Sequence, residues 1–237
     1  KNLLRFKLDI VHVHSIGFVW HDICILIKKI FSPKTKFVVT PHGPFMALKD
    51  YKLYQKFIKW KITKWIILTK NIYDKIIQVN PYQYNWLTKE YKFNKKKITY
   101  LPNGVPKEFL KKSKTNNNLK NKFIITFIGR LHKYKGIQDI IKVLPKIKKE
   151  NLLLLVIGKD AGHEKELKKL TKNLKLENKV MFLTDCSDKQ KEAYLQLSEI
   201  FIMPSEWEAF GITILEAMAK NNVIISTNTE GGKFLIK

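Results

Sequence analysis

The chain has 237 residues, enough for one large domain or two small ones, and its 45 Lys and Arg against 20 Asp and Glu give a net charge of +25. Almost all of the positive charge is lysine spread along the chain, so we attribute most of it to a composition bias. Some affinity for an anionic membrane surface is expected as well, and binding to nucleic acid is a much weaker alternative. The two cysteines, Cys24 and Cys186, form no CxxC pair, which counts against a disulfide framework or a zinc site and agrees with a reducing, cytoplasmic setting.

Apolar strands alternate with helical patterns in the first half, which predicts a parallel sheet covered by helices. The chain starts at Lys1 and enters an apolar strand within ten residues, so we expect a first domain that lacks elements at its start. The longest apolar stretch, 10–30, contains three histidines and three charged residues and is too polar to cross a membrane. Strands are expected at 10–14, 37–40, 76–79 and 98–101, and helices at 18–30, 51–72 and 81–90, with Pro81 in the first turn of the last helix.

The expected helix at 51–72 mixes six lysines with aromatic side chains such as Phe57, Trp60 and Trp65. Such a helix can lie on a membrane surface, and it can equally pack on a sheet with a solvated lysine face. We therefore expect a cytoplasmic protein, and a peripheral position on the inner face of the membrane stays open.

Residues 111–118 contain no apolar side chain and are the best linker in the chain. We expect a partial first domain at 1–112, a linker at 113–121 and a second domain at 122–237. In the second domain, strands are expected at 123–129, 152–158, 180–183, 200–203 and 223–226, and helices at 137–149, 164–173, 189–197 and 212–220, with another helix beginning near 231. The fold class is therefore α/β, with two tandem Rossmann-like, doubly wound parallel-sheet domains of which the first, and the end of the second, are incomplete.

The loop after the first strand of the second domain carries Gly129, Arg130 and Lys135 before a helix begins. Ligands bind at the carboxyl ends of strands in open α/β sheets, and Arg offers a bidentate fork to phosphate oxygens while Lys adds a point charge. The loop is neither GxGxxG nor a P-loop, so NAD and ATP lack their usual sequence support.

The segment 205–219 sets Glu208 in a loop after an apolar strand, then Gly211, then a short helix that carries Glu216. Backbone N–H groups and the helix dipole favour binding of phosphate, and carboxylates accept hydrogen bonds from sugar hydroxyls. A nucleotide-sugar has both phosphate and hydroxyl groups and therefore fits this segment. An acid and base pair of a glycoside hydrolase is the rival interpretation, but a hydrolase has no need of the phosphate-type loop at Arg130.

In the first half, His42 sits in a Gly/Pro turn directly after a strand, where it would face the cleft between two domains. It could donate to a phosphate or a sugar hydroxyl, or remain a solvated turn residue. His12 and His14 share one face of their strand, and His14 is nearer its carboxyl end. No carboxylate spacing supports a metal site formed by these histidines, and none is predicted.

With these features the chain resembles the retaining nucleotide-sugar glycosyltransferases of family four, which have the GT-B architecture of two Rossmann-like domains. The resemblance rests on four motifs in order: Thr40-Pro41-His42-Gly43, Pro102-Asn103-Gly104-Val105, Gly129-Arg130 with Lys135-Gly136, and Glu208-Ala209-Phe210-Gly211 with Glu216-Ala217-Met218-Ala219. It implies transfer of a sugar with retention of configuration, from a UDP-, GDP- or ADP-sugar to a glycan or lipid-linked acceptor, without a metal or other cofactor.

The resemblance also implies roles for single residues. Arg130 and Lys135 would hold the donor diphosphate, Glu208 the sugar hydroxyls, and Glu216 the ribose. The catalytic group would be His42, Arg130, Lys135 and Glu208; further donor contacts would come from Gly129, Cys186, Ser187, Phe210, Gly211 and Ile212, and acceptor-side residues would be His14 and Gly43.

The chain departs from the family in a few places. We expect this sequence to lack the family's first strand, its glycine-rich loop and the helices that brace the first domain, and Leu235 and Asn222 stand where the family often has Glu and Pro or Gly. Two alternatives stay open: a sugar-nucleotide 2-epimerase, which shares the architecture, and a catalytically incompetent nucleotide-binding fragment, which the expected gaps suggest.

Overall fold

The computed structural model describes residues 6–48, 51–112, 119 and 121–236. The chain divides into two compact units, Lys1–Asn103 and Gly104–Lys237, and each is described by itself. The expected linker at 113–121 lies mostly outside the described residues, so the domain limits at 112 and 122 stay a prediction. Among the described residues, no helix is both long and apolar enough to cross a membrane.

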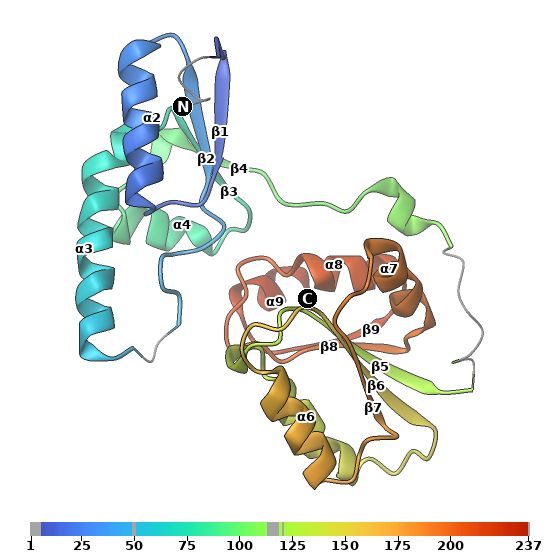
Figure 1. Ribbon diagram of the computed structural model, residues 1–237. Coiled ribbons are helices and arrows are strands. Elements are labelled where there is room, and N and C mark those ends of the chain that lie inside the picture. Colours follow the sequence, from blue (N-terminus) through green and yellow to red (C-terminus); the bar gives the residue numbers. More distant parts are fainter. Residues whose placement is uncertain (1–5, 49–50, 113–118, 120, 237) are drawn as a thin grey trace. The chain divides into compact units, whose positions relative to one another are not determined.

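Unit 1 is a parallel sheet in the strand order β1-β2-β3-β4, flanked by helices (Figure 1). Its core packs Phe37, Val39 and Ile76 of the sheet against Ile25 and Ile66 of two helices. The elements are β1 (Ile10–His14), α2 (Val19–Phe31), β2 (Lys36–Thr40), α3 (Leu53–Thr69), β3 (Lys75–Gln78), α4 (Gln83–Asn85), a π-helical turn (Trp86–Glu90) and β4 (Ile98–Tyr100).

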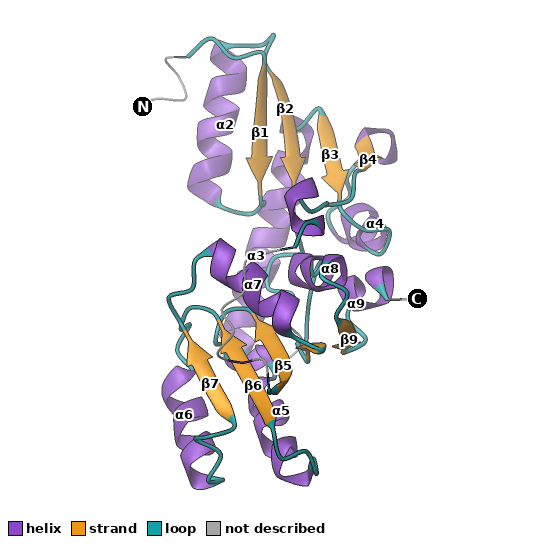
Figure 2. Ribbon diagram, turned by 90° about the vertical axis from the view of Figure 1, so that its right-hand side faces the viewer, coloured by secondary structure: helices purple, strands orange, loops and turns teal. Residues whose placement is uncertain are grey.

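Unit 2 is a five-stranded parallel sheet in the order β7-β6-β5-β8-β9. The strands are β5 (Phe123–Ile128), β6 (Leu152–Ile157), β7 (Val180–Leu183), β8 (Ile200–Met203) and β9 (Val223–Ser226). The helices are α5 (Ile137–Val143), α6 (Glu164–Asn173), α7 (Asp188–Leu197), α8 (Ile212–Ala219) and α9 (Glu230–Leu235), and helices lie on both faces of the sheet (Figure 2).

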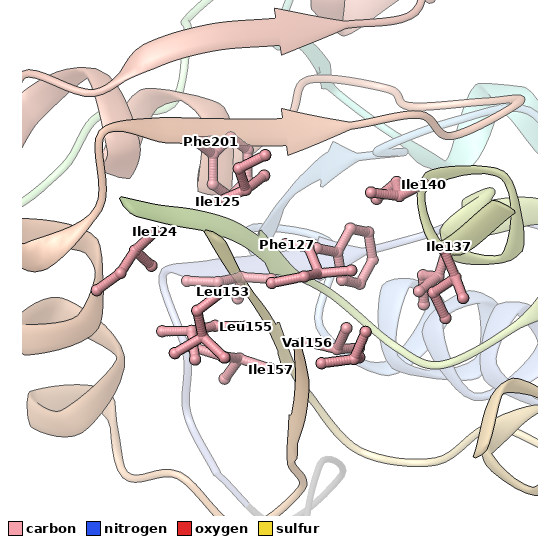
Figure 3. Packing of buried hydrophobic residues seen from close by; sticks show 14 of the residues in the cluster. Ile124, Ile125, Phe127, Ile137, Ile140, Leu153, Leu155, Val156, Ile157 and Phe201 are labelled. Atoms are coloured by element: carbon pink, nitrogen blue, oxygen red, sulfur yellow. The ribbon is translucent and has the colours of Figure 1, made fainter. Parts of the chain in front are cut away.

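The strand β6 is buried along its whole length and β5 along all but its first residue, because helices cover both faces of a doubly wound sheet. Phe127 and Leu155 are fully buried among aliphatic side chains of neighbouring strands and of α5 (Figure 3). This packed core holds the carboxyl ends of β5, β6 and β8 in fixed positions, and the loops of the candidate site start there.

The predicted strands agree with the structure to within one residue at each end, but three predicted helices are wrong in part. The helix expected at 137–149 ends at Val143, because Pro145 lacks the N–H that the helix needs, and a 3₁₀ turn follows. Pro81 lies in a turn ahead of α4 instead of in its first turn, since α4 begins at Gln83, whose side chain accepts from the Val79 N–H. The helix expected at 51–72 is α3 followed by a 3₁₀ turn.

Candidate functional site

The strand order of unit 2 reverses at β5, which pairs with β6 on one side and with β8 on the other. Chains leave the carboxyl ends of β5 and β8 in opposite directions, and such a switch point is where open α/β sheets bind ligands. The loop after β5 and the loop after β8 meet there, and the Glu206 N–H donates to the Tyr134 carbonyl at 2.9 Å.

Two glycines let the backbones at this edge approach closely. Gly136 is left-handed, with φ 73°, and a Cβ there would lie 2.3 Å from the Pro204 carbonyl oxygen. Gly158 has φ 146°, and its Cβ would lie 2.0 Å from the Gly129 carbonyl oxygen. Real Cβ atoms do not come so close to backbone, so any larger residue would push the site loops apart.

The centre of the site is an ion pair between the Lys135 Nζ and the Glu208 Oε1. Both side chains are largely buried, at 11% and 16% exposed. The Ser205 hydroxyl lies 3.4 Å from the same Oε1, and the Glu208 carbonyl accepts from the Gly231 N–H at 2.9 Å. Contacts from the loop after β5, from its own loop and from the first turn of α9 therefore hold Glu208 in place.

Arg130 is the exposed cation of the site. Its Nη2 donates to the Tyr134 hydroxyl at 3.1 Å, and the Tyr134 ring also carries the Lys135 Nζ 5.2 Å from its centroid. Both cations thus contact Tyr134, Arg130 through the hydroxyl and Lys135 through the ring, and Arg130 is exposed whereas Lys135 is buried. The exposed guanidinium retains further donors for an anionic ligand.

The third part of the site is the start of α8. Gly211 caps this helix with φ 81°, next to Phe210, which is buried against Phe234 with ring centroids 5.6 Å apart. The first N–H groups of a helix have no partner within the helix, and the dipole makes its N-terminus attractive to anions. Ile212, the first helical residue, is 46% exposed and leaves this end accessible.

Glu216 lies on α8, half-buried where α8 packs on α7. Burial raises the pKa of its carboxyl, the Lys191 ammonium opposes this, and Asp188 adds to it. Lys191 and Asp188 bond to each other at 2.8 Å in the first turn of α7, which Ser187 caps. Hydrogen bonds from ligand hydroxyls would stabilise a half-buried carboxylate of this kind.

Cys186 precedes that cap and is half-buried. Burial raises the pKa of its thiol, which favours the neutral thiol over the reactive thiolate.

Three histidines of unit 1 gather at the carboxyl ends of β1 and β2. The His14 Nδ1 lies 2.7 Å from the His42 Nε2, and the His12 Nε2 lies 2.8 Å from the Thr40 hydroxyl. Burial, then His14 and His12, lower the pKa of His42. His42 follows β2 in a left-handed conformation, with φ 61°. Within the described residues, no set of three or more His, Cys, Asp and Glu is arranged to hold a metal ion.

A family model described as Glycosyl transferases group 1 matches residues 108–237, more than half of the chain. The chain belongs to this family. A second model, Glycosyltransferase Family 4, matches residues 1–109 of this glycosyltransferase. The two matched ranges together cover all 237 residues.

Relatives agree with this assignment. The glycosyltransferase is 29% identical to an uncharacterized 41.2 kDa protein in the cps region of Klebsiella pneumoniae, over 96% of the chain and 62% of that protein. It is also 29% identical to the O-antigen biosynthesis glycosyltransferase WclY of Escherichia coli, over 96% of the chain and 63% of that protein. The chain thus spans about three fifths of the length of these relatives.

Solved structures share the fold. A glycosyltransferase from Rickettsia africae has a TM-score of 0.73 at 26% identity, covering 97% of this chain and 60% of that one. Anabaena Alr3699/HepE has a TM-score of 0.77 at 16% identity, over 97% of this chain and 62% of that one. The predicted fold class, two tandem parallel-sheet α/β units of the GT-B type, is confirmed.

All the residues that the sequence assigns to the donor lie in unit 2, where Lys135 and Glu208 contact each other directly and Glu216 lies apart from them and interacts electrostatically with Lys191 and Asp188 of α7; their roles toward a donor stay a prediction. The sequence assigns Lys135 to phosphate and Glu208 to sugar, whereas the structure pairs them with each other. From the sequence alone, no role was assigned to Tyr134, Ser205 or Gly231, each of which contacts Lys135 or Glu208. Tyr134 lies between Arg130 and Lys135 in the sequence, but only the fold shows that its hydroxyl contacts the first and its ring the second.

Proposed function

We propose that this glycosyltransferase moves a hexosyl group from a nucleotide-diphosphate sugar to a glycan or lipid-linked acceptor with retention of configuration. The observation that carries the proposal is the Lys135–Glu208 pair at the switch point, beside Arg130 and the start of α8. Cationic groups and carboxylates at one strand edge match a ligand that has both a diphosphate and hydroxyls. Solved structures of Anabaena Alr3699/HepE contain UDP with glucose, or UDP-glucose, which supports a donor of this class.

The proposed mechanism rests on charge that develops as the donor bond breaks. Arg130 and Lys135 would stabilise the departing diphosphate, together with the N-terminus of α8. Glu208, held on three sides, would bind hydroxyls of the donor sugar, and Glu216 the ribose hydroxyls. His42 would lie beside the donor sugar, and the acceptor would attack from the face that the nucleotide leaves. The reaction would need no metal.

The names of the relatives suggest the acceptor. WclY is named for O-antigen biosynthesis, and the Klebsiella relative for a cps region. We infer that the acceptor belongs to cell-surface polysaccharide biosynthesis.

Glu216→Gln is expected to remove binding of nucleotide-sugars and, at the same time, to raise the thermal midpoint at pH 7–8. Burial destabilises the ionised carboxylate in the folded state, which is why its pKa is raised. The neutral amide does not carry this cost. This gain is largest above the raised pKa and shrinks as the pH falls toward the ordinary pKa of a glutamate.

A thermal-shift panel of UDP-, GDP- and ADP-sugars at low and high salt measures both effects. Glu177→Gln, an exposed change in the turn ahead of β7, is the matched control and should keep the response. One nucleotide series should shift the wild type at either salt. Shifts that survive both Glu216→Gln and Arg130→Ala would refute the site. Release of nucleotide only on addition of acceptor would distinguish transfer from epimerisation.

We also propose that the protein lies peripherally on the inner face of the membrane through the N-terminal half of α3. Leu53, Phe57 and Trp60 are 86%, 54% and 55% exposed. The Lys61 and Lys64 ammonium groups lie over the Phe57 and Trp60 rings, at 4.8 and 5.9 Å. Exposed aromatic rings among lysines suit the interface of an anionic bilayer.

The variant Phe57→Ser/Trp60→Ser is expected to lose binding to phosphatidylglycerol vesicles, measured by co-sedimentation. Trp20→Ser, which removes a tryptophan that is 82% exposed on α2, is the control and should bind as the wild type does. Binding should weaken as salt rises, because the lysines supply part of it. Equal binding to neutral phosphatidylcholine vesicles, or full binding by the double variant, would contradict the proposal.

A further inference from the structure

The histidines at the edge of the unit 1 sheet form a hydrogen-bonded pair. Parallel pairing sets His14 of β1 opposite Thr40 of β2, and His42 follows two residues later. The planes of the His14 and His42 rings are nearly parallel, at 13°, and the ring centroids lie 5.1 Å apart, so the rings meet edge to edge, nitrogen to nitrogen. The two residues, far apart along the chain, are thus aligned by strand register.

A hydrogen bond between two imidazoles needs one proton between the two nitrogens, so the tautomers of the two rings are tied together. Neutral imidazole favours a proton on Nε2. In this pair, the His42 Nε2–H can donate to the His14 Nδ1 at 2.7 Å, and both rings then keep that favoured form. The His42 Nδ1 is left without a proton and can only accept.

The surroundings of His42 favour its neutral form. Burial and the neighbouring His14 and His12 lower the pKa of His42. Two further groups that contact the cluster are polar and neutral: the Thr40 hydroxyl bonds to His12, and the Gln83 amide donates to the His42 carbonyl at 3.4 Å. A neutral His42 cannot act as a cation toward phosphate.

We propose that His14 is a positioning residue that fixes the tautomer of His42, so that the His42 Nδ1 accepts a hydrogen bond from a ligand hydroxyl. This deepens the proposed function and rests on it, because a sugar supplies the hydroxyl. His42 would then distinguish a hydroxyl, which can donate, from an unprotonated phosphate oxygen, which cannot.

The test is ¹⁵N NMR of the histidine rings of the full chain, which has only six histidines. In the wild type, the His42 Nε2 should be protonated and its Nδ1 unprotonated at pH 7.5, and the lowered pKa of His42 should keep its ring neutral to lower pH than an ordinary histidine. In His14→Phe, which keeps an aromatic ring but no nitrogen, His42 should become a mixture of tautomers and take up its proton at higher pH.

Two further variants separate positioning from packing. His14→Asn puts an amide near the place of the Nδ1 and should restore the single tautomer, whereas His14→Gln puts it near the place of the Nε2 and should not. An unchanged His21 spectrum reports an intact fold in each variant. A His42 spectrum that is the same in the wild type and in His14→Phe, or a wild-type His42 protonated on Nδ1, would overturn the proposal. Failure of every nucleotide-sugar to shift the thermal midpoint would count against the proposed function instead, so the two failures are distinct.

Discussion

Lys135→Met is expected to lower the free energy of unfolding of unit 2 by about 3–5 kcal/mol and to remove the response to nucleotide-sugars. The side chains of Lys135 and Glu208 are only 11% and 16% exposed, so the variant leaves a carboxylate in a largely dry place without its counter-charge. Met keeps the length of the lysine stem, and the loss is therefore one of charge more than of packing. Urea denaturation followed by circular dichroism measures the stability.

A double-mutant cycle tests the reason. Lys135→Met/Glu208→Gln should be more stable than Lys135→Met, because no charge is then left unpaired, yet it should still fail to bind donor. Lys142→Met is the matched control: its ion pair with Asp139 is 59% and 65% exposed, and its loss should cost about 1 kcal/mol or less. If Lys135→Met were as stable as Lys142→Met, the buried pair would not support the site.

Gly158→Ala is expected to lower the free energy of unfolding of unit 2 by about 3 kcal/mol or more, the largest effect expected there from the addition of a single methyl group. The new Cβ would meet the Gly129 carbonyl oxygen at 2.0 Å, and the backbone already stands at φ 146°. Relief requires the ends of β5 and β6 to separate, which would displace Arg130 as well. Donor binding should therefore fall together with stability.

Gly162→Ala is the control for backbone strain alone. Gly162 has φ 91° with nothing within 4 Å of its Cβ position, so alanine there should cost about 1–3 kcal/mol and leave the site in place. The difference between the midpoints of the two variants in urea isolates the contact with Gly129. Equal midpoints would mean that the β5 and β6 ends move apart freely.

Much of the fold could be predicted because the strands are apolar runs with clear limits. Leu152–Ile157 is buried throughout and reads as a central strand from its side chains alone. Helix limits are harder to predict where a local hydrogen bond decides them. Pro145 marks the end of α5 in the sequence itself, whereas the start of α4 depends on the bond between the Gln83 side chain and the Val79 N–H.

The candidate site could be predicted as a set of residues but not as a set of contacts. The motifs indicate Lys135 and Glu208, yet their mutual bond joins positions 73 residues apart and depends on the order β5-β8 in the sheet. From the sequence, His42 is assigned to the catalytic group and His14 to the acceptor side. Their hydrogen bond depends on strand register and on a left-handed residue, and neither has a sequence pattern that shows it.

The strand β9 has a consequence for how copies of the chain behave toward one another. It pairs with β8 and, among the described strands, stands at one border of the unit 2 sheet, with Val223 and Ile225 63% and 49% exposed. An edge strand with exposed β-branched side chains presents backbone N–H and C=O groups that can pair with a strand of another chain. The net charge of +25 opposes this by repulsion between copies. The same lysines that attract anions thus also keep the chains apart, and screening by salt weakens that protection.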